Sequence, residues 1–273
     1  MVGTYVEILL EGDCPEDELI NLSEKGFDEI VRIEKIMSFR DESSELAMIN
    51  RQSSKGSVEI SEEMAQVLGL SLKLSALTDG AYDLSIASCL VGAGLLPKVD
   101  GFEQASGDWR DMQLAGRMLR FERPLILDLG GIAKGYAVDC ALRAIGEDVN
   151  VVVNAGGDIR MNPWQGKSAE IRFPYNGRFV SIEWSMLAPA MATSASYFHE
   201  GDNPIFSPLS QEPIKDDRSI TVFADTCMLA DALTKIAFLS HSGLEIIKGF
   251  GATAVIVKEN GEFVTSEDYA DNS

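Results

Sequence analysis

Residues 127–135 read Leu-Asp-Leu-Gly-Gly-Ile-Ala-Lys-Gly, and they have the composition of a phosphate-binding site. Apolar residues Leu125 to Leu127 are typical of a short strand, and Ile132 to Ile145 have a helical pattern that Gly146 would end. Glycines let the backbone approach a ligand closely, and the first turn of a helix presents free N–H groups to an anion. The stretch fits neither the Walker A loop nor the dinucleotide GxGxxG motif. The sequence therefore predicts a strand, a glycine-rich turn and a helix that bind a phosphate-bearing ligand; the alternative is a tight turn whose glycines only aid packing.

A carboxylate and a hydroxyl stand three residues apart on a second apolar helix, expected from about Met228 to Leu239. At this spacing Asp231 and Thr234 share a helix face. Their oxygen atoms are the kind of ligand that Mg²⁺ prefers. The alternative is that Asp231 is a carboxylate near the helix N-terminus, favoured there by the helix dipole.

Three further motifs are weaker. The run Asn154-Ala155-Gly156-Gly157-Asp158 closes a β-branched strand, Val149–Val153, and its glycines indicate a turn or a close approach to a ligand. The run Asp79–Asp83 reads as a plain turn, and the run Ala192–Tyr197 reads as a polar loop.

Histidine is scarce, and its scarcity excludes some kinds of site. The chain has two histidines, His199 and His241, which leave little room for a histidine-based triad or a histidine-rich metal site. His241 is expected to be a cation at a helix C-terminus. His199 follows Tyr197 in a loop, where it is either a surface residue or a site residue.

The elements that must position these residues mix helices and strands without strict alternation. Leu19 to Met37 have the three-and-four spacing of an amphipathic helix, and Ser61 caps a second helix that ends before Asp79. Strands are expected at Val6–Leu10, Glu170–Phe173, Phe179–Trp184 and Ile220–Phe223, and Asn260-Gly261 predicts a hairpin between Ala254–Val257 and Phe263–Thr265. This mixture favours an α+β fold with mixed sheets packed against helices, in a single domain over residues 1–273.

The composition excludes nucleic acid as a partner. The 273 residues carry a formal net charge of −20, whereas phosphate backbones are bound by clustered Lys and Arg. An acidic chain that binds an anionic ligand must neutralise it locally, with a metal ion or with backbone N–H groups. The simpler explanation of the charge is a soluble, acid-rich surface.

The sequence also predicts a compartment. The four cysteines are far apart and form no CxxC pair, so neither a disulfide nor a zinc site is expected, and Cys140 and Cys227 are predicted core residues. The first residues lack a basic region followed by an apolar one, and no apolar run approaches the roughly 18–20 residues that span a bilayer. We expect a cytoplasmic protein without a membrane anchor, or one trimmed at its N-terminus.

Taken in order, the motifs resemble the ApbE family, the FAD:protein FMN transferases once described as thiamine-biosynthesis lipoproteins. The matching stretches cover nearly the whole chain: Gly3–Tyr5, Met37–Phe39, Ser44–Leu46 to Asn50, Asp79–Asp83, Leu127–Asp139, Val153–Ile159, Ala192–Ser194 with Tyr197, and Ala230–Leu233. The resemblance implies an α+β fold similar to the T-fold. It also implies a Mg²⁺-dependent enzyme that splits FAD at its pyrophosphate, transfers FMN to a Thr or Ser hydroxyl of an acceptor flavoprotein and releases AMP.

The same resemblance implies roles for individual residues. The metal ligands would be the carbonyl of Ala133 and the side chains of Asp231 and Thr234. Asp231 and Thr234 would also be catalytic, with His199 as a candidate for proton transfer. The flavin nucleotide would be bound by Ser38, Ala81, Tyr82, Asp83, Gly130, Lys134, Tyr136 and Thr193.

The chain departs from the family pattern at three places. Lys235 stands where the family usually has a Thr, four residues after the metal-binding Asp. The residues from Pro204 to Gln211 lack the His and Asp of the family's His-x-x-Asp-Pro-x-Thr-Gly segment, and Ala195 replaces a usual Gly. These departures keep two alternatives open: a flavin-binding protein without turnover, and a Mg²⁺-dependent FAD pyrophosphatase.

Overall fold

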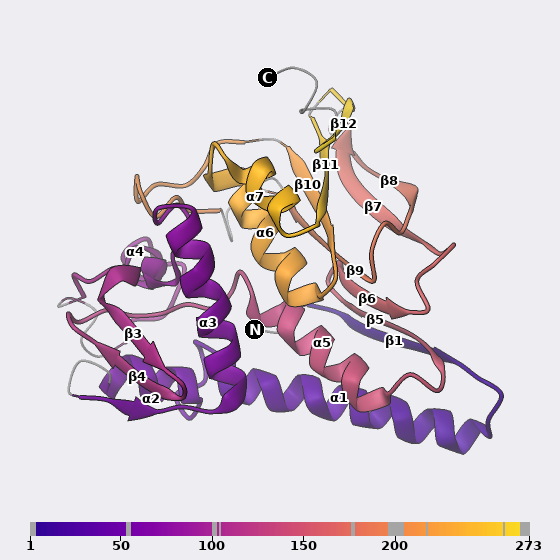
Figure 1. Cartoon of the computed structure of the whole chain (residues 1–273), viewed down its shortest axis with the longest axis horizontal. Helices are drawn as coiled ribbons and strands as arrows, with labels where there is room; N and C mark the ends of the chain where they lie inside the picture. Colours follow the sequence, from indigo (N-terminus) through magenta and orange to yellow (C-terminus); the bar gives the residue numbers. More distant parts are fainter. Residues whose placement is uncertain are drawn as a thin grey trace.

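A seven-stranded sheet, antiparallel at every pairing, is the central element of the computed structural model (Figure 1). The structure describes residues 4–52, 56–99, 103, 105–175, 178–195, 205–216, 218–258 and 260–267. The order of the strands in the sheet is β1 (Val6–Glu11), β5 (Asn150–Ala155), β6 (Asp158–Asn162), β9 (Ala190–Ala195), β10 (Ser219–Ala224), β11 (Thr253–Val257) and β12 (Phe263–Thr265).

The two faces of this sheet are covered differently. Helices α5 (Ala133–Ile145) and α6 (Cys227–Leu239) pack on one face, α1 (Glu16–Met37) packs against α5, and α7 (Gly243–Gly249) against α6. Alternate strand residues point to opposite faces, and those that share a core with the helices include many alanines: Ala190, Ala192, Ala224 and Ala254. Small side chains let α6 lie close to the sheet. The hairpin of β7 (Ser168–Tyr175) and β8 (Arg178–Ser185) covers part of the other face, over Ile159, Met191, Phe223 and Val255.

A second region lies beside the sheet and is joined to it by α1 (Figure 1). It contains α2 (Glu45–Gln52), α3 (Glu62–Leu77), α4 (Ala87–Gly92) and the small sheet of β2 (Val58–Glu59), β4 (Met118–Phe121) and β3 (Met112–Ala115). Buried residues of both regions, such as Met64 of α3 and Ile256 of β11, belong to one continuous apolar core. The α+β fold expected from the sequence is confirmed.

Several local predictions hold in detail. The Ser61 hydroxyl accepts the backbone N–H of Met64 at 3.1 Å and so caps α3. Gly146 ends α5 with φ of 93°, a conformation that favours glycine. Gly261 has φ of 79° in the turn between β11 and β12, which pair as the predicted hairpin. Cys140 and Cys227 are buried.

The predicted strand at Leu125–Leu127 is wrong. These residues are buried but belong to no strand. The side chain of Asn50, from α2, takes the place of a neighbouring strand: its carbonyl oxygen accepts the Leu127 N–H at 2.9 Å and its NH₂ donates to the Leu127 carbonyl at 3.0 Å. The next N–H, of Asp128, donates to the Leu84 carbonyl at 2.9 Å. A side-chain amide thus satisfies the backbone in the way that a strand would, without forming a ladder.

The polar loop expected at Ala192–Tyr197 is also wrong for residues 192–195, which lie in β9 inside the sheet. The hydroxyl groups that suggested a loop form hydrogen bonds with one another inside the protein. Thr193 Oγ1 lies 2.9 Å from Thr221 Oγ1, and Ser194 Oγ lies 2.7 Å from Thr234 Oγ1. Residues 196 and 197 lie outside the described residues. In the parts of the chain that the structure describes, no helix is both long and apolar enough to cross a bilayer.

Candidate active site

The N-terminal ends of α5 and α6 meet without intervening side chains. A methyl group built on Gly135 would lie 2.3 Å from the carbonyl oxygen of Cys227, so only glycine fits there. Because Gly135 packs against α6, this glycine brings two helices together rather than clearing space for a ligand. The contact places the first turn of α5 directly beside Asp231 on α6.

Asp231 belongs to a cluster of four charged side chains, in which two buried carboxylates meet two partly exposed lysines. Its Oδ1 accepts a hydrogen bond from Lys235 Nζ at 2.7 Å, and its Oδ2 accepts the Gly135 N–H at 3.3 Å. Lys134 Nζ lies 3.9 Å from the same Oδ2 and forms an ion pair with Asp158. Two carboxylates therefore alternate with two ammonium groups, and the Asp231 carboxylate lies at the N-terminal end of α5.

Burial and neighbouring charges shift the pKa values within this cluster. Burial, and then the charge of Asp231, raise the pKa of Asp158 to about 6, although Lys134 and Lys235 oppose the shift. Burial also acts to raise the pKa of Asp231, but the two lysines and the hydrogen bonds outweigh it, so the pKa lies below its ordinary value. Asp231 is thus held ionised by its cations.

Lys235 is the most highly connected of these side chains. Besides Asp231, its Nζ donates to Ser194 Oγ at 2.8 Å and lies 3.2 Å from Thr234 Oγ1. The Thr234 hydroxyl lies 2.7 Å from the Asp231 carbonyl oxygen, to which it donates. The structure therefore brings the predicted residues Asp231 and Thr234 together, with the lysine ammonium between their oxygens.

The glycine-rich turn lies against this lysine. A methyl group built on Gly131 would be 3.5 Å from Lys235 Cγ, which is ordinary van der Waals contact. The exposed Gly130 donates its N–H to Asp128 Oδ2 at 3.1 Å. Ala133 is buried and is the first residue of α5. The predicted stretch therefore borders the charge cluster.

Tyr82 approaches the cluster from the second region. It is buried, and its hydroxyl makes no hydrogen bond to any residue in the described ranges. Burial raises its pKa most, the Ser71 hydroxyl acts in the opposite direction, and the negative charges of Asp231 and Asp128 raise the pKa further. A buried hydroxyl that makes no hydrogen bond costs free energy of folding, and a bound ligand that hydrogen-bonds to it would remove this cost.

The turn that carries Tyr82 is fixed by Trp109. Asp79 and Gly80 have φ of 48° and 81°, and a methyl group on Gly80 would lie 2.8 Å from Trp109 Nε1. Asp83 accepts the N–H of Ser85 at 2.8 Å and that of Trp109 at 3.2 Å. Burial nevertheless raises the pKa of Asp83. Asp83 therefore holds the turn in place, with the buried Ala81 between it and Gly80.

Two predicted binding residues lie elsewhere. The Ser38 hydroxyl accepts the Asp41 N–H at 3.3 Å where α1 ends, and the Ser38 carbonyl accepts the Ser44 hydroxyl at 2.6 Å. Thr193 is the strand neighbour of Ser194, so its side chain points to the sheet face away from α6 and pairs with Thr221. The structure does not bring either hydroxyl to the charge cluster.

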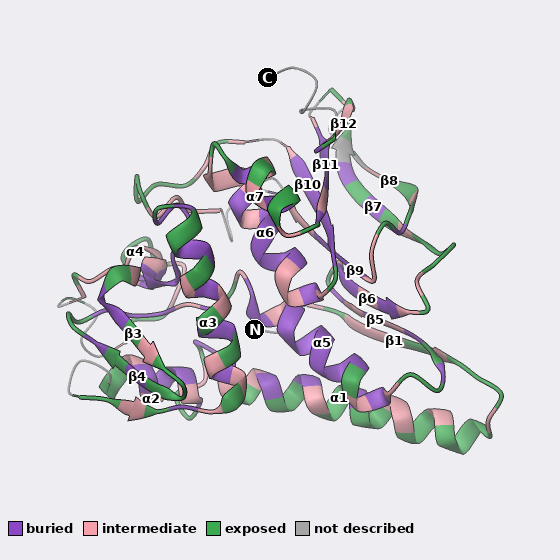
Figure 2. Cartoon of the chain, in the orientation of Figure 1, coloured by how far each residue is buried: buried purple, intermediate pink, exposed green. Residues whose placement is uncertain are grey.

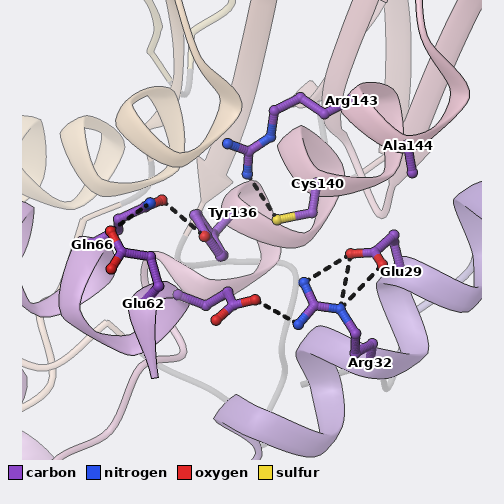
Figure 3. A pocket seen from close by; sticks show the side chains of 9 residues that line it. Glu29, Arg32, Glu62, Gln66, Tyr136, Cys140, Arg143 and Ala144 are labelled. Atoms are coloured by element: carbon purple, nitrogen blue, oxygen red, sulfur yellow. Dashed lines mark hydrogen bonds and ion pairs between the residues drawn. The ribbon is translucent and has the colours of Figure 1, made fainter. Parts of the chain in front are cut away.

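Tyr136 faces a separate pocket of about 390 Å³ between α1, α3 and α5 (Figure 3). Its hydroxyl donates to Gln66 Oε1 at 2.9 Å, and it stands two positions after Lys134 on α5, which places the two side chains on nearly opposite sides of the helix. The pocket is lined by Glu29, Arg32, Glu62, Glu63, Gln66, Tyr136, Cys140, Arg143 and Ala144. The binding role of Tyr136 stays a prediction.

The remaining catalytic prediction, His199, lies outside the described residues. Sequence reasoning did not select Asp158, Ser194 or Asp139 as site residues. The spacing of Asp231 and Lys235, four residues apart on a helix, is a readable signal of an ion pair. Nothing in the spacing links Lys134 with Asp158 or Ser194 with Thr234, because sheet register and helix packing create those contacts.

The oxygens predicted to hold Mg²⁺ do not fit that ion as they stand. Asp231 Oδ1 and Thr234 Oγ1 both face the Lys235 ammonium, and Asp231 Oδ2 accepts a backbone N–H. Mg²⁺ requires about six oxygen ligands in near-octahedral geometry. Within the described ranges, no group of three or more His, Cys, Asp or Glu residues is placed to hold a metal ion.

Comparison with known proteins identifies the family. The ApbE family model matches residues 2–257. A relative from Haemophilus influenzae named FAD:protein FMN transferase is 28% identical, over 91% of this chain and 83% of its own. The ApbE crystal structure from Thermotoga maritima matches with a TM-score of 0.80 and 26% identity, over 98% of this chain and 95% of that chain. The flavin transferase ApbE of Vibrio cholerae shares the fold with a TM-score of 0.79 at 21% identity, over 98% and 99%. The chain therefore belongs to the ApbE family, and these two relatives from Haemophilus and Vibrio are named as transferases.

Proposed function

We propose that this chain is an FAD:protein FMN transferase that acts as one domain over residues 1–273. The observation that carries the proposal is the pair of ammonium groups, Lys134 and Lys235, held beside the glycine-rich turn in a chain of net charge −20. Such a local cation pair is what an acidic protein needs to bind a pyrophosphate. The names of the relatives supply the substrate class.

The reaction requires one bond to form and one to break. The hydroxyl oxygen of a Thr or Ser on the acceptor flavoprotein attacks the phosphorus on the flavin side of FAD. A phosphoester bond forms, the bridging P–O bond breaks, and AMP leaves with the bridging oxygen. Lys134 and Lys235 stabilise the negative charge that develops on the phosphate oxygens. His199 is the proposed acceptor of the hydroxyl proton.

The other proposed contacts follow the resemblance. Asp231 and Thr234 orient the Lys235 ammonium, and the Tyr82 hydroxyl is available to bind a ligand oxygen. Ser38, Ala81, Asp83, Gly130, Tyr136 and Thr193 complete the proposed flavin-binding set. A Mg²⁺ ion on Ala133, Asp231 and Thr234 stays a prediction of the resemblance, and no step here depends on it.

One assay tests the proposal. The purified protein is incubated with FAD and a candidate acceptor domain, with and without Mg²⁺, and AMP release and the mass of the acceptor are measured. Transfer predicts equal amounts of AMP and of acceptor that carries one FMN. AMP without the adduct would indicate a pyrophosphatase, and tight FAD binding without AMP would indicate a flavin-binding protein; either result would overturn the transferase proposal.

A variant links the reaction to the cluster. Asp231→Asn keeps the shape of the side chain but removes the charge that holds Lys235 in place. We expect the rate of AMP release to fall by about tenfold or more, because a charge-assisted hydrogen bond at the site is lost. Asp216→Asn, at the separate ion pair with Arg218, is the matched control and should leave the rate unchanged.

A further inference from the structure

The Lys235 ammonium fills a cage of oxygen atoms. It has three N–H donors, and three side-chain oxygens surround it: Asp231 Oδ1 at 2.7 Å, Ser194 Oγ at 2.8 Å and Thr234 Oγ1 at 3.2 Å. Each acceptor comes from the rigid contact of α6 with β9. A hydrogen bond for each N–H offsets the cost of removing a partly buried ammonium from water.

This cage is close to solvent on one side. The Lys235 side chain is 20% exposed, whereas Asp231 is fully buried. The lysine stem runs along Gly131, within the turn whose Gly130 is exposed. An anion at the glycine-rich turn would lie beside the lysine stem, and it could accept an N–H of Lys235 in place of the Thr234 hydroxyl, the most distant of the three acceptors, while the Asp231 hydrogen bond stays.

Lysine at this position changes the site in two ways at once. It offers no oxygen ligand, and it adds one positive charge where the resemblance leads us to expect a neutral hydroxyl. The first change removes a ligand from any metal that uses Asp231, and the second repels a divalent cation at close range. Both changes weaken the binding of a divalent metal ion.

We propose that the Lys235 ammonium is the resident cation of this site and that the chain binds the pyrophosphate of its substrate without a divalent metal ion. The metal-free part of this inference rests on the contacts and the charge of Lys235. The part that concerns pyrophosphate rests on the proposed function.

The first experiment measures metal binding by the protein alone, with Mn²⁺ as the probe and paramagnetic resonance of free Mn²⁺ as the readout. Lys235→Thr should gain one Mn²⁺ site that the wild-type protein lacks, and the double variant Lys235→Thr with Asp231→Asn should lose it again. The comparison of variants cancels weak binding to the acidic surface. A wild-type protein that binds one Mn²⁺ at a site abolished by Asp231→Asn would overturn the proposal.

The second experiment measures FAD affinity by flavin fluorescence, with Mg²⁺ and with EDTA. Wild-type affinity should be the same in both. Lys235→Met, which keeps the length but not the charge, should weaken binding by about tenfold or more in both conditions, and Lys235→Arg should restore part of it. Lys258→Met, at an exposed ion pair with Glu262, is the matched control and should bind as the wild type does.

The two experiments separate the inference from the proposed function. A loss of wild-type FAD affinity in EDTA would overturn the metal-free inference and leave the transferase proposal standing. A wild-type protein that binds no FAD, together with a Lys235→Thr variant that gains the Mn²⁺ site, would overturn the proposed function and support Lys235 as the resident cation.

Discussion

The Asp139 carboxylate of α5 accepts the backbone N–H of Cys227, the first residue of α6, at 2.9 Å. The other carboxylate oxygen accepts the Met228 N–H at 2.9 Å, and Arg160 from β6 donates to Asp139 at 2.6 Å. One helix therefore caps the next, in addition to the local cap from Thr226. Since Asp231 lies one turn further along α6, this cap fixes where the charge cluster forms.

We predict that Asp139→Ala destabilises the fold by about 3 kcal/mol, because it leaves the Arg160 charge without this partner and two helix N–H groups uncapped. The free energy of unfolding from urea titration measures the change. Glu59→Ala is the control: it breaks the ion pair with Arg117, in which the side chains of Glu59 and Arg117 are 66% and 50% exposed, and should lower the free energy of unfolding by less than about 1 kcal/mol. Equal losses in the two variants would contradict the capping role.

The close contact of Gly135 with Cys227 predicts a cost for any larger side chain. Gly135→Ala would force the helices apart and should destabilise the fold by about 3 kcal/mol. Gly69→Ala is the control: this glycine lies on the exposed side of α3 with no atom within 4 Å of an added methyl group, and the change should stabilise the protein by about 1 kcal/mol. Thermal unfolding of both variants provides the comparison, and a neutral Gly135→Ala would rule out the packing argument.

Asn50 is expected to stabilise the approach to the glycine-rich turn. Asn50→Ala leaves the Leu127 N–H and carbonyl without their partner and should cost about 2 kcal/mol. Faster hydrogen exchange at the Leu127 amide would locate the effect. Asn150→Ala removes a long 3.5 Å contact with Glu11 at the surface and should change neither quantity. Unchanged exchange at Leu127 in the first variant would contradict the assignment.

The raised pKa of Asp158 predicts a pH dependence of stability. Between its ordinary value of 3.8 and about 6, the folded protein binds a proton at Asp158 that the unfolded chain has released. The contribution of this group to stability therefore falls as pH rises through that window and is constant above it. Urea titrations at several pH values give the free energy of unfolding of the wild-type protein minus that of Asp158→Asn, a difference in which groups that do not interact with Asp158 cancel. A difference that rises with pH would have the wrong sign.

The local sequence was enough to predict elements whose stability is local. The apolar spacing over Leu19–Met37 gave α1, whose outward side is exposed and whose inner side is buried (Figure 2). The cap at Ser61 and the turn at Gly261 involve residues within a few positions of each other. In each of these cases, all the residues that form the element lie close together in the sequence, so the local pattern is enough to predict it.

Other features depend on partners that no window contains. The backbone of Leu127 is hydrogen-bonded by Asn50, 77 residues earlier, and not by a neighbouring strand. The polar residues of β9 are buried because Thr221 and Thr234 satisfy them. In the candidate site, Asp231 with Thr234 could be read from helix spacing, but the pairing of Lys134 with Asp158 required the sheet and the helix to be placed first.

The position of β1 has a consequence for the order of assembly. This strand comes first among the described elements, yet its partner is β5, where Val6 pairs with Ala155 and Glu11 with Asn150. During synthesis β1 cannot pair with β5 until more than half of the chain has been made. A pairing so distant in sequence slows folding, because the intervening chain must be ordered first.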